Sequence, residues 1–155
     1  MEKLYRDYFL VVYRYILSLS RDPLTAEEIT QETFFKALKH IDAFRGDSSI
    51  RSWLCQIAKN AWYDQARRQG RLTQLTEEGE DPALSMEEVI FLSADAREIH
   101  KVLHRLREPY KEVFSLRTFG ELSFSDIAEL FGKSESWARV TYHRARILIK
   151  EGLKP

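Results

Sequence analysis

Apolar residues recur at steps of three and four along the first seventy positions, which is the spacing of one helical face. This spacing predicts three helices, over about residues 5–19, 25–40 and 50–71. Strand-like alternation is absent. The positions expected to be buried are Tyr5, Tyr8, Phe9, Val12, Ile16 and Leu19, then Ile29, Phe34, Ala37, Leu38 and Ile41, and then Ile50, Trp53, Leu54, Ile57, Ala58 and Ala61.

Local signals indicate where the second and third helices begin. Thr25 and Glu28 have the spacing of a capping box, in which each side chain covers a free backbone amide of the first turn. The third helix follows a turn-rich loop over residues 44–48. It ends among arginines, which are favourable at a helix C-terminus.

The end of the chain carries a sharper pattern. Pro109 suits the first turn of one helix, and Ser123 can cap the next. Gly132 then stands where a left-handed terminator is needed, and Ser134 can cap a following helix. A short helix, a turn with glycine and a longer helix predict a helix-turn-helix.

In the last helix, one line of residues faces inward and another faces away. The inward line is Ala138, Tyr142, Ala145 and Ile149, and the outward set is Ser136, Val140, His143 and Arg144, with Trp137 and Arg139 on the flanks. Arginine can donate two hydrogen bonds to guanine, and valine can touch a thymine methyl. The outward set therefore suits a DNA major groove, although a solvated helix face has the same composition.

Charge divides the 155 residues into three segments whose net charges cancel. Residues 1–71 hold 12 Lys and Arg against 9 Asp and Glu, residues 72–95 hold none against 7, and residues 96–155 hold 12 against 8. The acidic middle is too polar to fold alone. We therefore expect an all-α protein of two small helical domains, 1–71 and 96–155, joined by a flexible acidic linker.

Several classes of protein are excluded. No apolar run approaches the roughly 20 residues that span a bilayer, and the charged opening is unlike a signal peptide, so no membrane insertion is expected. A single cysteine, Cys55, rules out an internal disulfide and fits a reducing cytoplasm. His100 and His104 are four apart, but no third ligand is evident. We expect no catalytic residue, no metal and no cofactor.

Three segments together resemble a known family. The first is Glu28-Ile29-Thr30-Gln31-Glu32-Thr33-Phe34, the second is Phe44-Arg45-Gly46-Asp47-Ser48 with Trp53-Leu54 and Asp64-Gln65-Ala66-Arg67-Arg68, and the third is Tyr142-His143-Arg144-Ala145-Arg146. Their order and spacing resemble the extracytoplasmic-function group of bacterial sigma factors, in the sigma-70 superfamily. The resemblance covers nearly the whole chain.

The resemblance implies a subunit of RNA polymerase that directs promoter recognition and DNA melting. Its first domain would bind the clamp coiled coil of core polymerase and the minus-10 element. Its second domain would bind the polymerase flap and the minus-35 element. An anti-sigma factor is implied as a further partner.

The resemblance also assigns residues to each contact. Polymerase would be bound by Glu28, Gln31 and Glu32. The minus-10 element would be bound by Arg45, Gly46, Asp47, Ser48, Gln56, Lys59, Trp62 and Tyr63. The minus-35 element would be bound by Ser136, Trp137, Arg139, Val140, His143 and Arg144. Glycine admits close backbone approach, while Asp and Ser can hydrogen-bond an exposed base edge.

Two positions depart from the family pattern. Trp137 stands where a small polar residue is usual, and it either alters docking or packs against the preceding helix. Tyr142 replaces an aliphatic residue, so its hydroxyl needs a partner. Both put the minus-35 sequence in doubt.

Two alternative functions remain open at this point. A conventional helix-turn-helix regulator would bind duplex DNA without polymerase, using residues 1–71 to dimerise or to sense an effector. A protein-interaction module would sequester a partner and use its basic faces only for solubility.

Overall fold

The computed structural model describes residues 2–44, 49–73 and 94–153, and every element in them is helical. Side chains are described for residues 3–44, 49–68 and 97–153. The elements are α1 (Glu2–Ser20), α2 (Pro23–Lys39), a short 3-10 helix η1 (Ile41–Ala43), α3 (Ile50–Thr73), α5 (Ala94–Arg105), α6 (Tyr110–Thr118), α7 (Phe124–Phe131) and α8 (Glu135–Leu153). The all-α prediction is confirmed.

The second helix starts earlier than its sequence predicts. It begins at Pro23, and its N-cap is Asp22, whose carboxylate accepts a hydrogen bond from the Leu24 amide at 3.3 Å. The Thr25 hydroxyl donates to the same carboxylate at 2.6 Å. The capping box expected at Thr25 was therefore wrong, because proline at the first helical position favours an earlier start.

The periodicity of α1–α3 identifies most of their buried face. Val12, Ile16 and Leu54 are among the fully buried side chains. Tyr5 of α1, also expected to be buried, is 44% exposed. The prediction fails again at the C-terminal end of α2 and in η1, where Leu38 is 52% and Ile41 is 38% exposed. No described helix covers these two residues, so they remain at the surface despite their apolar character.

The helix-turn-helix signals are confirmed. The Ser123 hydroxyl accepts from the Asp126 amide at 3.0 Å, and Ser134 caps α8 by accepting from the Trp137 amide at 3.0 Å. Gly132 is left-handed, with a φ of 65°. Pro109 lies at the N-cap of α6, one residue before the predicted first turn.

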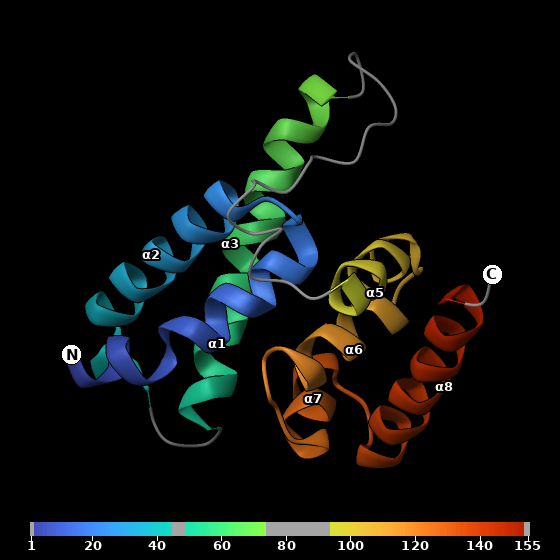
Figure 1. Ribbon diagram of the computed structural model, residues 1–155. Coiled ribbons are helices and arrows are strands. Elements are labelled where there is room, and N and C mark those ends of the chain that lie inside the picture. Colours follow the sequence, from blue (N-terminus) through green and yellow to red (C-terminus); the bar gives the residue numbers. More distant parts are fainter. Residues whose placement is uncertain (1, 45–48, 74–93, 154–155) are drawn as a thin grey trace.

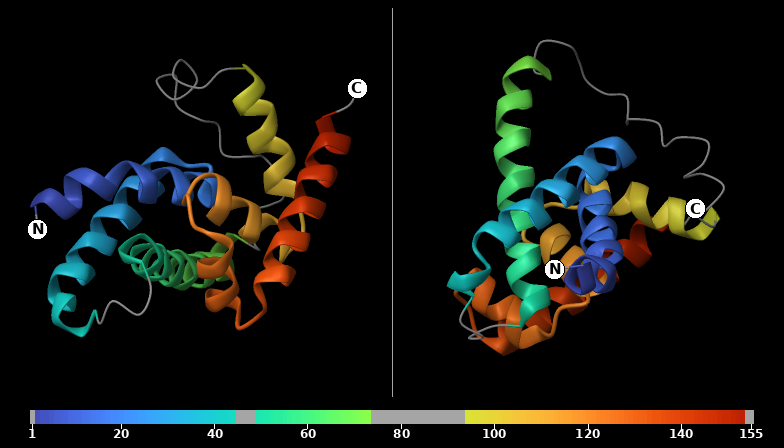
Figure 2. Two further views of the ribbon diagram at one scale, coloured as in Figure 1. Left: turned by 90° about the horizontal axis from the view of Figure 1, so that it is seen from below. Right: turned by 90° about the vertical axis from the view of Figure 1, so that its left-hand side faces the viewer.

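Helices α1–α3 and α5–α8 form two groups that pack directly against each other (Figure 1). Two further views show the same arrangement, with α5 and α8 side by side (Figure 2). Val113, Leu116 and Ile127 of the second group belong to the same buried apolar cluster as residues of α1 and α3. Leu103, Phe114, Ala145 and Ile149 form a separate, smaller cluster.

Candidate polymerase and nucleic-acid interfaces

The predicted polymerase residues Glu28, Gln31 and Glu32 lie together on the exposed side of α2. The Glu32 carboxylate is 3.2 Å from Lys36 Nζ, and both side chains are about two-fifths exposed. Such exposed helix pairs contribute little to stability. These carboxylates are therefore available to a partner at little cost to the fold.

Sequence reasoning missed three apolar members of this surface. Leu24, Phe35 and Leu38 are 72%, 59% and 52% exposed, on the same helix as the carboxylates. Leu24 is four residues before Glu28, Phe35 is four residues after Gln31, and Leu38 is three residues after Phe35, so all five share one face. That spacing was visible in the sequence, but the expected burial of Leu38 concealed it. We call Leu24, Glu28, Gln31, Glu32, Phe35 and Leu38 the α2 face.

The predicted minus-10 residues fall into different environments. Arg45, Gly46, Asp47 and Ser48 lie outside the described residues. Gln56 is exposed on α3, whereas Trp62 is half-buried against the larger apolar cluster. Trp53 also packs against that cluster, with its ring centroid 5.0 Å from that of Phe44. The structure thus brings Gln56, Lys59, Trp62 and Tyr63 onto one helix.

Lys59 and Tyr63 are engaged by the second group of helices. Lys59 Nζ lies 2.7 Å from Glu112 Oε1 and 4.7 Å from the centroid of the Phe131 ring. The Tyr63 hydroxyl hydrogen-bonds to Glu108. Burial and the carboxylates of Glu112 and Glu108 raise the pKa of Tyr63.

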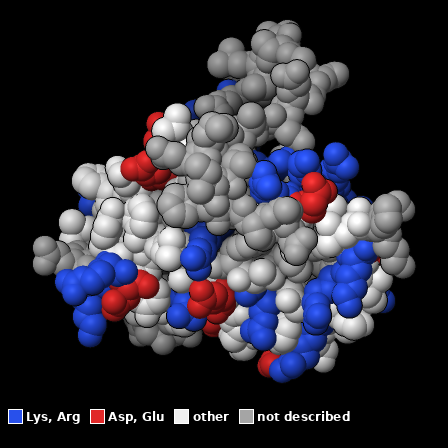
Figure 3. All heavy atoms as spheres, in the orientation of Figure 1, with Lys and Arg blue, Asp and Glu red and all other residues white. Residues whose placement is uncertain are grey.

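The predicted outward surface of α8 is exposed. Ser136, Val140, His143 and Arg144 are all exposed, whereas Ala138, Ala145 and Ile149 are buried on the opposite side. Lys and Arg side chains gather along the surface that α8 forms (Figure 3). α8 therefore presents a cationic face that includes two exposed apolar residues, Val140 at 48% and Ile147 at 44% exposure.

The two flanking residues of α8 are held by neighbours. The Arg139 guanidinium is 2.8 Å from the Glu135 carboxylate and 4.9 Å from the centroid of the Phe124 ring. Trp137 is half-buried, with its ring centroid 5.3 Å from that of Phe131. Trp137 thus packs on the preceding helix, which is one of the two outcomes expected for it.

Tyr142 lies in an aromatic cluster rather than in an aliphatic layer. Its ring stacks on Phe114 with centroids 5.7 Å apart, and the Phe124 centroid is also 5.7 Å away. Aromatic contacts of this kind stabilise beyond the area that they bury. They give the departure from the family pattern a packing role.

Glu108 lies in a crowded electrostatic environment. Partial burial and the nearby Glu112 carboxylate raise the pKa of Glu108 to about 7, against an opposing effect of Lys111. The folded chain therefore retains a proton that the unfolded chain releases near pH 4.5. The associated stabilisation is complete below pH 4.5 and is lost as the pH rises through about 7.

Glu108→Gln should consequently gain stability relative to the parent as the pH rises from 4.5 to 7.5, because the amide stays neutral. Chemical denaturation across this range measures the difference in the free energy of unfolding. Burial and Arg21 lower the pKa of His100, which adds an opposite pH dependence, but both proteins share it. A difference that does not vary with pH would contradict the prediction.

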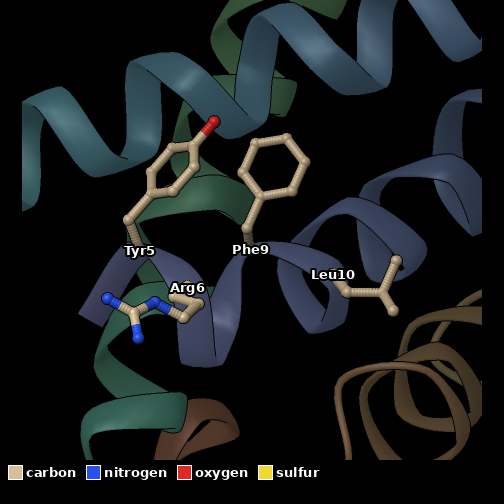
Figure 4. A pocket seen from close by; sticks show the side chains of 4 residues that line it. All are labelled: Tyr5, Arg6, Phe9 and Leu10. Atoms are coloured by element: carbon tan, nitrogen blue, oxygen red, sulfur yellow. The ribbon is translucent and has the colours of Figure 1, made fainter. Parts of the chain in front are cut away.

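An open hollow of about 480 Å³ lies on α1, lined by Tyr5, Arg6, Phe9 and Leu10 (Figure 4). Tyr5 and Phe9 point toward α2, with Tyr5 5.2 Å from the Phe34 ring centroid. None of the four side chains is a carboxylate, an imidazole or a thiol. Within the described side chains, no His, Cys, Asp and Glu cluster suits a metal ion.

Among the described helices, none combines the length and the apolar character needed to cross a membrane.

Comparison with known families assigns both groups of helices. Residues 4–72 match Sigma-70 region 2, and residues 96–149 match Sigma-70 region 4. The RNA polymerase sigma factor YlaC of Bacillus subtilis is 33% identical, over 99% of this chain and 91% of its own. The ECF RNA polymerase sigma-E factor of Haemophilus influenzae is 31% identical, over 83% and 74% of the two chains.

Solved structures agree with this assignment. The sigma factor RpoE, in complex with the anti-sigma factor NepR from Bartonella quintana, gives a TM-score of 0.76 at 26% identity, over 99% of this chain and 98% of that one. CnrH, in complex with the cytosolic domain of CnrY, shares the fold with a TM-score of 0.70 at 20% identity. Sequence and fold together show that this chain belongs to the extracytoplasmic-function group of sigma-70 RNA polymerase sigma factors.

Proposed function

We propose that this sigma factor is a non-catalytic subunit that binds core RNA polymerase in the cytoplasm through the α2 face. It opens the minus-10 element with α3 and the preceding loop, and it reads the minus-35 element with α8. The observation that carries the proposal is that one chain exposes both an acidic and apolar helix face and a separate cationic recognition helix.

The α2 face has the composition of a protein contact. Phe35 follows the carboxylates along α2 and provides a large, exposed aromatic anchor. Leu24 precedes them and provides an exposed apolar residue. Energetically important interface residues are typically aromatic or charged, surrounded by residues that exclude water. A basic and apolar partner surface, such as the polymerase clamp coiled coil, would complement this face.

Phe35→Ala is expected to weaken binding to core polymerase by about tenfold or more, the usual cost of removing an aromatic anchor. The stability of the free protein should change little, because the ring is 59% exposed and contacts the Lys39 ammonium at 4.8 Å. Fluorescence anisotropy with labelled protein measures the affinity, and thermal melting measures the stability. Unchanged affinity would remove Phe35 from the interface.

The two DNA surfaces differ in their chemistry. Gln56 and Lys59 lie on α3, close to Trp62, which offers an aromatic edge beside polar groups. Aromatic rings can stack on unpaired bases, which suits melted DNA. The outward face of α8 has the arginine, serine and valine that suit duplex DNA in a major groove. This division matches a melted minus-10 and a duplex minus-35 element.

We also propose an anti-sigma factor as a partner. RpoE and CnrH, which share this fold, were each solved in complex with another protein, NepR and CnrY respectively. The exposed α2 face would offer such a partner the same apolar and acidic groups that it offers polymerase. Competition between the two partners for this chain would test the overlap.

Reconstituted transcription tests the function as a whole. Purified core polymerase, a promoter library and the full chain should yield transcripts from a subset of promoters, with none when either protein is omitted. A conventional helix-turn-helix regulator would bind duplex DNA yet leave core polymerase unable to start at promoters. Absence of chain-dependent transcripts across the library would refute the proposed function.

A further inference from the structure

The helix that carries the predicted minus-10 residues faces the second group of helices. Leu54 and Ala58 of α3 share one buried cluster with Leu116 and Ile127 of α6 and α7. Val12 and Tyr15 of α1 belong to the same cluster. The contact between the two groups therefore has an apolar centre, and its polar rim lies along α3.

Along this rim, donor groups of α3 and of Ser49, the residue before it, contact oxygen atoms of the second group. The Ser49 hydroxyl donates to Asp126 Oδ2 at 3.0 Å, and Arg51 Nη1 donates to the Glu121 carbonyl at 3.2 Å. Farther along α3, Lys59 pairs with Glu112. The contacted donors thus run from the residue just before α3 through the first three turns of this helix.

The Lys59–Glu112 pair is the most enclosed of these contacts. Only 21% of the Lys59 side chain and 8% of the Glu112 side chain are exposed, whereas the pairs within α5 and α8 are about half exposed. The Coulombic attraction within a pair shielded from water is stronger than at the surface, and removing one partner leaves an uncompensated buried charge. The Lys59 ammonium is therefore unavailable to a phosphate while this contact holds.

We propose that the acceptors Asp126, the Glu121 carbonyl and Glu112 take the place of DNA phosphates on α3. The chain described here is then a closed state, in which the second group of helices blocks the minus-10 surface. Opening of the contact exposes Ser49, Arg51 and Lys59 to DNA. This inference rests on the proposed function, because it takes α3 to be a DNA-binding helix.

Cys55 provides a reporter of this contact. It is the single cysteine of the chain and is fully buried on α3. Gly120, between α6 and α7, approaches it so closely that a Cβ atom added to this glycine would lie 3.3 Å from the Cys55 sulfur. Burial raises the pKa of the Cys55 thiol to about 12, which makes it unreactive at neutral pH. Departure of the second group would uncover the thiol and allow it to react.

Glu112→Gln in the full chain should therefore raise the reaction rate of Cys55 with Ellman's reagent by at least about tenfold, because it breaks the enclosed pair. The affinity for a fluorescein-labelled, single-stranded 20-mer of random sequence should rise in parallel. Asp126→Asn removes a second acceptor charge and should change both quantities in the same direction by a smaller factor. Glu98→Gln, which removes an exposed pair with Lys101 away from this contact, is the matched control and should change neither.

The outcomes separate the inference from the proposed function. Unchanged thiol reactivity in Glu112→Gln and Asp126→Asn, with unchanged circular dichroism, would overturn the closed state. A faster thiol reaction without tighter binding of the 20-mer would overturn the phosphate mimicry. Both measurements omit polymerase, so a failure of the transcription assay alone would count against the proposed function only.

Discussion

Replacing both Glu28 and Glu32 by Lys is expected to weaken the affinity for core polymerase by about 30- to 1000-fold, the equivalent of about 2–4 kcal/mol. Both carboxylates lie at the centre of the α2 face, between Leu24 and Phe35. Charge reversal there would place like charges together in a contact from which water is excluded, and like-charge juxtaposition costs several kcal/mol. Binding of labelled double variant to immobilised core polymerase measures the effect.

The fold should tolerate this change. Glu32 loses its exposed pair with Lys36, which costs about 0.3–0.5 kcal/mol for a helix pair of this kind. Glu98→Lys is a suitable control, because Glu98 also forms an exposed pair within a helix, with Lys101 on α5. If the double variant melts like the parent and still binds polymerase with the parent's affinity, the role of the α2 face is refuted.

The helices were predictable because each is specified by nearby residues. The caps at Ser123 and Ser134 and the left-handed Gly132 depend on backbone amides no more than four residues away. The start of α2 was mispredicted for a comparable local reason. Asp22 and Thr25 can both cap a helix, and the choice was made by Pro23 between them.

Contacts between distant residues were not predictable. Periodicity shows that Leu54 and Ala58 face inward, but it does not show that α6 and α7 would cover them. Nothing near Lys59 in the sequence indicates Glu112, which is more than fifty residues away. Leu38 illustrates the reverse case, since its position on α2 fits a buried line although no described helix packs over it.

Among the residues predicted to bind DNA, local features were again predictable and contacts between helices were not. The outward side of α8 follows from helical geometry alone, and its four predicted members are all exposed. The attachment of Arg139 to Glu135 follows the four-residue spacing of helix ion pairs and was available from the sequence. The attachment of Arg139 to Phe124 required the turn between α7 and α8 to be placed in three dimensions.

The surroundings of Arg139 and Arg144 suggest different contributions to minus-35 binding. Arg139 is restrained by Glu135 and by the Phe124 ring, so its direction is set before DNA arrives. A restrained guanidinium loses less freedom on binding, which favours a directed contact with a base. Arg144 is exposed on the outward face, and no described side chain forms an ion pair with it.

Arg144→Ala is expected to lower the affinity of the full chain for its minus-35 duplex by about 5- to 150-fold, which corresponds to about 1–3 kcal/mol. At least one of Arg139→Ala and Arg144→Ala should also relax the preference at a defined base pair. Loss of a phosphate contact would instead weaken binding to all sequences alike, and it would reduce the dependence of log affinity on log salt concentration by about one. The two roles are therefore separable in one data set.

The experiment uses a promoter selected by the transcription assay, together with scrambled duplexes, over a series of salt concentrations. The full chain is suitable because the outward face of α8 is exposed while the two groups of helices are in contact. Arg105→Ala, which removes an equally charged, exposed residue from the end of α5, controls for net charge. If the Arg139 and Arg144 variants both match the parent in affinity, salt slope and base preference, α8 does not read the minus-35 element, and polymerase contacts must position this part of the chain.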